Sequence, residues 1–333
     1  MADMTGVLRW GVLGTGFISH SVIEAIEQSP GSSVEIIGGR NAERVAEFAV
    51  QYGIDRSSTD MVAVVEDPSI DVVYVGLPNH VHHEIAIASA VAGKAVLSEK
   101  SLTTTMEAAH ELVDGVRSAG TFFVEGLMYL AHPLLSTFVQ VLTDGRLGTI
   151  RSIRGSYAAN IADLVNPQGM GTLYNLGCYP VSLLQLVMQA CFGDDAFHER
   201  TLKSVGNLSD SDGTVVDAAC VVRFGNGVLA TLQSSDSYGN GSEFAVGGDR
   251  GTLRFETNPW LPLGGENVII WDPFEGGVER IVVHDEHDAF FHQIQMVERR
   301  VAAGGLEAER PSPRLSDSIE IMEMLTDWEA QCR

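Results

Sequence analysis

A glycine-rich turn near the start of the chain constrains the fold more than any other feature. Apolar residues 10–13 run into Gly14-Thr15-Gly16, and an apolar-periodic segment over 17–26 follows at once. This order predicts a buried strand, a tight turn and a helix start. Gly14 can take a positive φ, and Gly16 has no Cβ to hold a phosphate away from the backbone. Because a helix start attracts anions, the turn predicts a dinucleotide site.

The first third of the chain alternates short apolar runs with helical patterns. Further strands are expected over 34–38, 70–77, 95–98 and 121–125, and helices over 42–52, 80–92 and 104–119. This alternation is typical of a doubly wound parallel sheet, which binds ligands at the carboxyl ends of its strands. We therefore predict an α/β, NAD(P)-binding Rossmann domain over residues 1–126.

After residue 126 the pattern changes to longer strands joined by glycine-containing turns. Strands are expected over 150–160, 215–224, 227–235, 243–247 and 251–256, and helices over 176–188, 288–303 and 315–329. The pattern predicts an α+β domain over 127–333 for substrate binding and oligomerisation. Its sheet should be large, mostly antiparallel and open on one face.

Charge and cysteine content narrow the class of protein. The 333 residues carry a net charge of −23, which repels nucleic acid and anionic lipid, so neither partner is expected. No apolar run approaches the roughly 18 residues of a membrane span, and the first residues lack a signal-peptide core. The four cysteines form no C-x-x-C pair, and we expect buried thiols in a cytoplasmic protein.

The end of the second expected strand sets the choice of cofactor. Sites for NAD commonly place an acidic residue there, about 20 residues after the glycines. This chain has Arg40, and Glu35 lies too early, inside the strand. A guanidinium suits a 2′-phosphate, so NADP is predicted with NAD as the alternative cofactor. An ordinary solvated arginine would explain Arg40 equally simply.

Two polar constellations follow strand or turn signals. Lys100, next to Glu99, ends the strand expected at 95–98 and could donate to a substrate oxygen; a plain surface ion pair is the alternative. Asn175 and Tyr179 stand four apart before an apolar helix and should share a face. Tyr179 could transfer a proton if a cation lowered its pKa from the usual value of about 10, or it could simply pack in a core.

A third polar cluster contains residues that often bind metals. His284, Asp285, Glu286, His287 and Asp288 precede an apolar helical run, with His292 following. Their spacing fits no closed zinc pattern, and acidic residues suit the start of a helix. No metal site is expected.

Five segments occur in an order that resembles the glucose–fructose oxidoreductase, inositol dehydrogenase and rhizopine-catabolism (Gfo/Idh/MocA) family. They are residues 14–18, 77–84, 93–100, 125–133 and 175–179. The likeness spans nearly the whole chain and is closest to dihydrodiol dehydrogenases and NADP-linked aldose dehydrogenases. It implies a Rossmann domain followed by an open-faced α/β domain, whose sheet often forms the oligomer interface.

The resemblance also implies roles for individual residues. Lys100 matches the family's catalytic lysine, and Tyr179 stands where many members have histidine; which of the two carries the proton stays open. Together with the glycine turn and Arg40, the implied cofactor contacts are Gly14, Thr15, Gly16, Phe17, Ile18, Arg40, Leu77, Pro78, Asn79, His82, Glu99 and Lys100. The expected substrate contacts are Tyr129, Asn160, Asn175 and Tyr179.

Three positions depart from the family pattern. Ser101 replaces the usual proline after the catalytic lysine. Asn175 replaces an aspartate that commonly contacts substrate, and Leu130 stands where arginine often follows Met-Tyr. The substrate is therefore less defined than the reaction.

These observations predict an NADP-dependent oxidoreductase. It would transfer hydride between nicotinamide and a hydroxyl or carbonyl carbon of a sugar, cyclitol or cyclic diol. The alternatives are a reductase of a nucleotide-linked or cyclitol keto-sugar, and a non-catalytic NADP-binding regulator. The presence of both Lys100 and Tyr179 favours an enzyme, and the open sheet face favours a homodimer or homotetramer.

Overall fold

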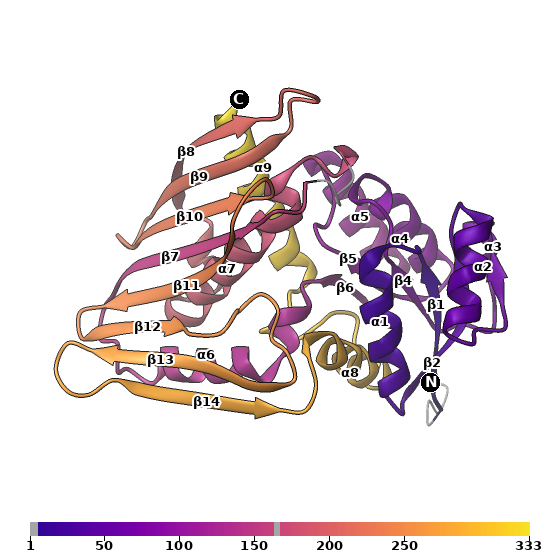
Figure 1. The fold of residues 1–333 in the computed structure, drawn as a ribbon, viewed down its shortest axis with the longest axis horizontal. Helices are drawn as coiled ribbons and strands as arrows, with labels where there is room; N and C mark the ends of the chain where they lie inside the picture. Colours follow the sequence, from indigo (N-terminus) through magenta and orange to yellow (C-terminus); the bar gives the residue numbers. More distant parts are fainter. Residues whose placement is uncertain (1–5, 163–166) are drawn as a thin grey trace. The chain divides into compact units, whose positions relative to one another are not determined.

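The computed structural model describes residues 6–162 and 167–333 and divides into two compact units (Figure 1). The first unit takes in the chain up to Ala131 together with Phe290–Ser318. The second comprises His132–Ala289 and Ile319–Arg333. Sequence patterns placed one boundary after residue 126, whereas the structure returns a late segment to the first unit.

The first unit is built on a parallel sheet. Its strands are β1 (Leu8–Leu13), β2 (Ser32–Gly38), β3 (Ser57–Ser58), β4 (Val72–Val75), β5 (Ala95–Glu99) and β6 (Phe123–Gly126). They lie in the order β3-β2-β1-β4-β5-β6, which is the strand order of the Rossmann fold. All pairings are parallel, so the carboxyl ends of the strands share one edge, where this fold binds its ligand.

Helices cover this sheet, and one of them comes from far along the chain. They are α1 (Phe17–Gln28), α2 (Ala42–Gln51), α3 (Met61–Val65), α4 (His82–Val91), α5 (Met106–Ala119) and α8 (Ala289–Ala302), with 3-10 turns η1 (Asn79–Val81) and η2 (Met128–Ala131). Ile294 and Val297 of α8 join the apolar core around Trp10. Glu298 accepts hydrogen bonds from the Ser29 and Ser32 hydroxyls at 2.5 and 2.6 Å. These contacts explain why α8 belongs with the first unit.

The second unit is built on a large, mostly antiparallel sheet, as predicted. Its strands are β7 (Ile150–Ala159), β8 (Arg200–Leu208), β9 (Val215–Phe224), β10 (Leu229–Ser235), β11 (Asn240–Gly248), β12 (Gly251–Phe255), β13 (Gly265–Pro273) and β14 (Glu279–Asp285). Their order is β14-β13-β12-β11-β7-β10-β9-β8. Within it, β7 and β10 pair in parallel, and this places their carboxyl ends side by side.

Helices lie against one face of this sheet (Figure 1). They are α6 (Pro133–Thr143), α7 (Cys178–Phe192) and α9 (Leu315–Cys332), with short turns η3 (Pro167–Gly169), η4 (Leu173–Gly177) and η5 (Asp194–Phe197). Burial alternates along β10, where Ala230 and Leu232 are buried and Leu229, Thr231 and Gln233 are exposed. The other sheet face is therefore open, as the strand patterns predicted.

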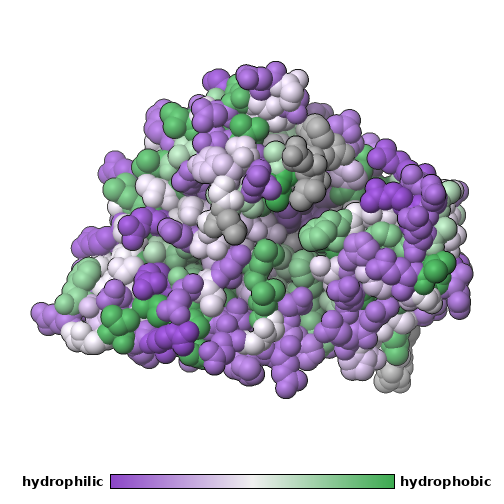
Figure 2. Space-filling model, in the orientation of Figure 1, coloured by the Kyte–Doolittle hydropathy of each residue, from purple (hydrophilic) through white to green (hydrophobic). Residues whose placement is uncertain are grey.

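The face drawn in Figure 2 is largely hydrophilic. Figure 2 shows polar and charged residues over most of the visible face, with apolar residues in smaller groups. Across the described ranges, no helix is both long and apolar enough to span a membrane. Cys178 and Cys220 are buried thiols, as expected, but the thiols of Cys191 and Cys332 are only half-buried.

Candidate active site

The glycine turn is held tightly at the carboxyl edge of the first sheet. The Gly14 N–H donates to the Gly38 carbonyl at 2.8 Å, and the Gly76 N–H donates to the Leu13 carbonyl at 2.7 Å. Gly14 has a φ of +116°, and a Cβ there would lie 2.2 Å from the Gly76 oxygen. A side chain at Gly14 is excluded on both counts.

The start of α1 is open. Gly16 precedes the helix in an extended conformation, and a Cβ on it would meet nothing within 4 Å. Over the described length of α1, no side chain caps the helix and no acidic residue lies in its first turn. Its unpaired N–H groups and dipole therefore favour an anion such as a phosphate. Thr15 and Ile18 are half-buried beside this opening, and Phe17 is exposed.

Two arginines follow β2. Arg40 is exposed directly after the strand, as its position predicted. Arg44, in the first turn of α2, donates from Nη2 to the Thr15 carbonyl at 2.8 Å and so lies over the glycine turn. Sequence reasoning missed Arg44, although a cation four residues after Arg40 at a helix start could have suggested it. Glu35 accepts from the Ser33 hydroxyl within the strand.

His82 lies between the loop after β4 and the segment after Lys100. His82 is fully buried; its Nε2 lies 2.6 Å from the Leu77 oxygen and its Nδ1 lies 3.2 Å from the Ser101 oxygen. Burial lowers the pKa of His82 to about 4, so the imidazole is neutral at pH 7 and its single N–H can donate to only one of these two carbonyls. The shorter distance favours the Leu77 carbonyl as the acceptor. His82 thus holds Leu77 and Pro78, which are half-buried, in place.

The environment of the Asn79 side chain indicates whether this edge of the sheet fits a dinucleotide. Its Nδ2 is buried and has no hydrogen-bond partner among the described residues. Buried amide donors are almost always satisfied, so this one suits an acceptor on a ligand. It lies in the loop after β4, the neighbour of the strand that feeds the glycine turn. The open space at Gly16 and the orphaned amide of Asn79 both fit a bound dinucleotide.

Lys100 directly follows β5 at the same edge, next to two buried carboxyl groups. Tyr74 donates from its hydroxyl to Glu99 at 3.1 Å, and the Lys100 N–H points to the other Glu99 oxygen at 3.3 Å. Burial raises the pKa of Glu99, and Lys100 opposes that shift. Burial also raises the pKa of Glu125 to about 7. The peptide bond between Lys100 and Ser101 is cis.

The four expected substrate residues divide between the units. Tyr129 lies in η2 of the first unit and is fully buried. Asn160, Asn175 and Tyr179 all belong to the second unit. Asn160 is exposed at the end of β7, and the other two are buried.

In the second unit, a turn before α7 is fixed onto the ends of β9 and β10. A Cβ on Gly171, which has a φ of +83°, would lie 2.4 Å from the Val215 oxygen, so only glycine allows this approach. The hydroxyls of Thr172 and Ser234 are 2.8 Å apart. The chain then continues as the π-helical turn η4, a form often found at functional sites.

Tyr179 lies in an aromatic cluster at the start of α7. Its ring meets the Tyr157 ring edge-on at 5.2 Å and lies 6.2 Å from the Trp260 ring. Trp260 is fixed by its indole N–H, which donates to the Ser156 carbonyl at 3.0 Å. Rigid aromatic rings with polar edges suit one face of a carbohydrate or cyclic diol.

A buried carboxylate lies beside Asn175. The Asn175 amide donates to Asp236 Oδ2 at 3.2 Å, and Asp236 is 2% exposed. The N–H groups of Ile161 and Ala162, which follow Asn160, donate to the Asp236 carbonyl at 2.9 Å. Sequence reasoning missed Asp236; its place directly after the polar end of a strand was the available signal.

The residues near 284–288 do not gather at one point. Among the described residues, no group of three or more His, Cys, Asp or Glu side chains could hold a metal ion. His284 belongs to β14, and the Asp285 carboxylate accepts from the His287 backbone N–H at 2.9 Å.

Comparison with protein families identifies both parts of the chain. Residues 8–127 match the oxidoreductase family model with an NAD-binding Rossmann fold, and residues 136–254 match the GFO/IDH/MocA C-terminal domain. The uncharacterized oxidoreductase ORF334 of Rhizobium meliloti is 30% identical over 79% of this chain and 78% of its own length.

Two further relatives have named activities. The trans-1,2-dihydrobenzene-1,2-diol dehydrogenase of Bos taurus is 26% identical over 77% of this chain and 76% of its own length. Among solved structures, KijD10, a 3-ketoreductase from Actinomadura kijaniata in complex with TDP-benzene and NADP, is 25% identical. It covers 96% of each chain with a TM-score of 0.82. The resemblance seen in the sequence is confirmed, and the chain belongs to the GFO/IDH/MocA family of NAD(P)-binding oxidoreductases.

Proposed function

We propose that this protein is an NADP-dependent dehydrogenase or reductase acting on a sugar, a cyclitol or a cyclic diol. The observation that carries the proposal is the position of Lys100, at the carboxyl end of β5 on the edge that holds the glycine turn. A charged donor next to a hydride-transfer cofactor can stabilise an oxygen that gains negative charge. The relationship to a diol dehydrogenase supports a polyhydroxylated ring as substrate.

The cofactor edge supports NADP as the preferred cofactor. The diphosphate would bind the N–H groups at the start of α1, and Asn79 would donate its free amide. Arg40 and Arg44 follow β2, and the residues between β2 and α2 include no carboxylate that would repel a 2′-phosphate. His82 and Glu99 would act by holding the neighbouring backbone, because each is buried and bonded to it.

The reaction needs a proton transfer at the substrate oxygen. The bound nicotinamide supplies a hydride acceptor or donor. Tyr179 is proposed to take the proton from the substrate hydroxyl during oxidation and to return it during reduction. Lys100 would donate a hydrogen bond to the same oxygen and remain positively charged. The reverse assignment, with Lys100 as the proton carrier and Tyr179 as a positioning group, uses the same residues.

A reductase of a nucleotide-linked keto-sugar is the second candidate function. It is favoured by the similarity over nearly the whole chain to KijD10, whose structure contains NADP and TDP-benzene. A panel of sugars, cyclitols and cyclic diols with NADP, and of keto-sugars with NADPH, distinguishes the two by nicotinamide absorbance. Turnover of a free polyol supports the first function, turnover only of nucleotide-linked substrates supports the second, and no turnover contradicts both.

The cofactor preference has its own test. We expect NADP to bind more tightly than NAD, as titrated by quenching of tryptophan fluorescence. Arg40→Ala and Arg44→Ala should each weaken NADP binding about tenfold, while NAD binding stays unchanged. Arg56→Ala is a matched control, because this exposed guanidinium pairs with Asp67 away from the glycine turn. Equal effects of the three substitutions on NADP binding would contradict the proposal that Arg40 and Arg44 bind the 2′-phosphate.

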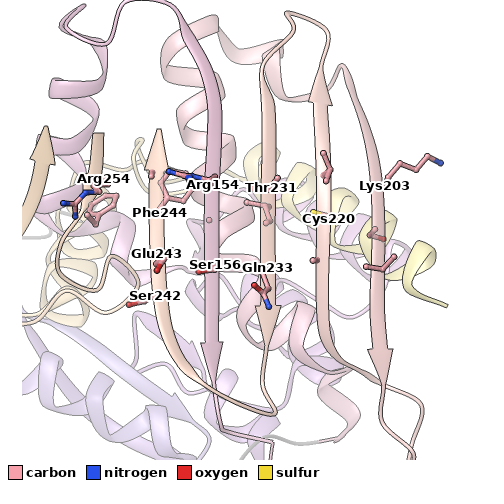
Figure 3. Close-up of a pocket in the computed structure, with 18 of the residues that line it drawn as sticks. Arg154, Ser156, Lys203, Cys220, Thr231, Gln233, Ser242, Glu243, Phe244 and Arg254 are labelled. Atoms are coloured by element: carbon pink, nitrogen blue, oxygen red, sulfur yellow. The ribbon is translucent and has the colours of Figure 1, made fainter. Parts of the chain in front are cut away.

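The open face of the second sheet is the proposed dimer contact of a cytoplasmic protein. Figure 3 shows Arg154, Thr231, Gln233 and Glu243 on neighbouring strands of this sheet, around a pocket. Both signs of charge occur among the lining residues, as a face that pairs with its own copy requires. Exposed Val221 and Leu229 add apolar surface on β9 and β10.

A further inference from the structure

Asp236 has an unusual environment for a carboxylate. It is 2% exposed, it follows the last residue of β10, and its Oδ2 accepts a hydrogen bond from Asn175 at 3.2 Å. Its Oδ1 is buried and has no hydrogen-bond partner among the described residues. A buried carboxylate oxygen without a donor is costly, so this atom suits either a proton or a donor from a ligand.

The backbone around Asp236 is fixed. Its N–H donates to the Val216 carbonyl at 3.2 Å, and its carbonyl accepts from the N–H groups of Ile161 and Ala162 at 2.9 Å. Nearby, the Thr172 and Ser234 hydroxyls are bonded to each other, and Ser234 also donates to the Thr172 carbonyl. Ser235 donates to the Val216 carbonyl. These neighbouring hydroxyls are engaged, and none of the described residues donates to Oδ1.

The position of Asn175 relates this carboxylate to Tyr179. Asn175 lies in the π-turn η4, and Tyr179 lies four residues later at the start of α7. Four residues correspond to about one helical turn, roughly 6 Å along the axis. A ligand at the Tyr179 cluster can therefore extend to the Asn175–Asp236 pair.

We propose that Asp236 is a specificity-determining residue, whose Oδ1 accepts a hydrogen bond from a second hydroxyl of the substrate, next to the reacting carbon. Asn175 orients the carboxylate by holding Oδ2. The assignment rests on the proposed polyol oxidoreductase function and adds the group that distinguishes a polyol from a simple alcohol. Burial raises the pKa of Asp236 while the Asn175 hydrogen bond opposes that shift, which fits a carboxyl completed by a donor.

The first test compares two substrates on two proteins. With a polyol that the parent protein oxidises, Asp236→Asn should lower kcat/KM 10- to 100-fold, mainly through KM, because a hydrogen bond to a charged group is lost. A deoxy analogue without the neighbouring hydroxyl should be poorer for the parent by a similar factor. For Asp236→Asn, the two substrates should differ less than threefold. If the variant discriminates between them as strongly as the parent, Asp236 does not contact that hydroxyl.

A matched control and a rescue separate this role from a structural one. Asp217 accepts from the Asn207 amide at 3.2 Å on the same sheet but is more exposed, so Asp217→Asn should leave both substrates unchanged. The double variant Asn175→Asp/Asp236→Asn returns a carboxylate to the pair and should recover at least tenfold of the lost kcat/KM. No recovery, in a variant with the parent's Tm, would contradict the proposal.

A binding measurement tests the role of Asp236 without relying on turnover. Calorimetry of the NADP-loaded parent over the panel of sugars, cyclitols and cyclic diols selects a polyol that binds, whether or not it is turned over. Asp236→Asn should bind that polyol at least tenfold more weakly than the parent does, with unchanged NADP affinity. If the parent turns over no substrate but this difference is found, the proposed oxidoreductase function fails while the assignment of Asp236 stands. If both proteins bind the polyol equally, the assignment of Asp236 fails.

Discussion

Substitutions of Tyr179 and Lys100 should both lower turnover, and they test different proposed roles in the reaction. Tyr179→Phe keeps the ring that packs on Tyr157 and Trp260 but removes the hydroxyl, so kcat should fall about 10²-fold or more if Tyr179 carries the proton. Lys100→Met should lose most turnover while NADP still binds, because the proposed phosphate contacts are at the glycine turn. Single-turnover rates and NADP titrations of both variants provide the measurement.

The comparison of Tyr179→Phe with Lys100→Met decides which of the two residues carries the proton. Tyr157→Phe is the matched control, since Tyr157 lies in the same aromatic cluster without a proposed proton role. Turnover of Tyr179→Phe within a few-fold of the parent would remove Tyr179 as the acid–base. If Lys100→Met also retains turnover, neither residue has the family's catalytic role in this protein.

The raised pKa of Glu125 predicts that the stability of the protein depends on pH. Its pKa is 4.5 in the unfolded chain and about 7 in the fold, mainly because it is buried. Between these values the folded protein binds more protons, so the free energy of unfolding falls as pH rises from about 4.5 to about 7. The difference corresponds to about 3 kcal/mol. Glu125→Gln should therefore be more stable than the parent at about pH 8, with the gap closing near about pH 5.

Denaturant unfolding of both proteins at these pH values tests that dependence. Glu111→Gln is the control, because Glu111 is exposed on α5 and should give no pH-dependent difference. A constant gap between Glu125→Gln and the parent across this pH range would mean that Glu125 ionises normally in the fold.

At the scale of elements, the two glycines of the turn from β1 to α1 should have different roles. Gly14 should matter for stability and Gly16 for cofactor binding. Gly14→Ala should lower stability by about 1–3 kcal/mol, because φ is +116° and the Cβ would meet the Gly76 carbonyl. Gly16→Ala has an ordinary φ of −84° and open space, so its Tm should equal that of the parent. Its methyl group should nevertheless weaken NADP binding. Equal NADP affinity of Gly16→Ala and the parent would place the diphosphate elsewhere.

Much of the first sheet was predictable because β4 and β5 are short, fully buried runs and β1 and β2 end in buried apolar or glycine residues. The two-residue strand β3 consists of serines, gave no such signal and was missed. The structure places β2 at 32–38 and β5 at 95–99, within two residues of the expected ranges. The helix α6 was missed although Pro133 stands at its first turn and His132 caps it through Nδ1. The edge strand β8 was also missed, because it carries charged and glycine residues that mask its alternation.

Other features depend on contacts between distant residues. The placement of α8 with the first unit rests on Glu298, which bonds to Ser29 and Ser32 more than 260 residues earlier. The pairing of Asn175 with Asp236 joins positions 61 residues apart. The spacing of residues in a single sequence does not indicate contacts between positions so far apart. The motifs therefore indicated the segments at the carboxyl edge of the first sheet, whereas the Asn175–Asp236 pair could not be found from them.

At the scale of the whole molecule, we expect a homodimer formed through the open face of the second sheet. Val221 on β9 and Leu229 on β10 are 51% and 49% exposed, and the pocket on this sheet is lined by charged side chains of both signs. Burying these apolar groups against a second copy is favourable, and a twofold axis can pair the opposite charges. Val221→Glu should therefore convert a dimer to a folded monomer at micromolar concentration, as measured by light scattering and circular dichroism. Val50→Glu is the matched control, because Val50 is 84% exposed on α2, outside the sheet, and should leave the dimer intact. A monomeric parent, or a Val221→Glu protein that stays dimeric, would rule out this face as the contact.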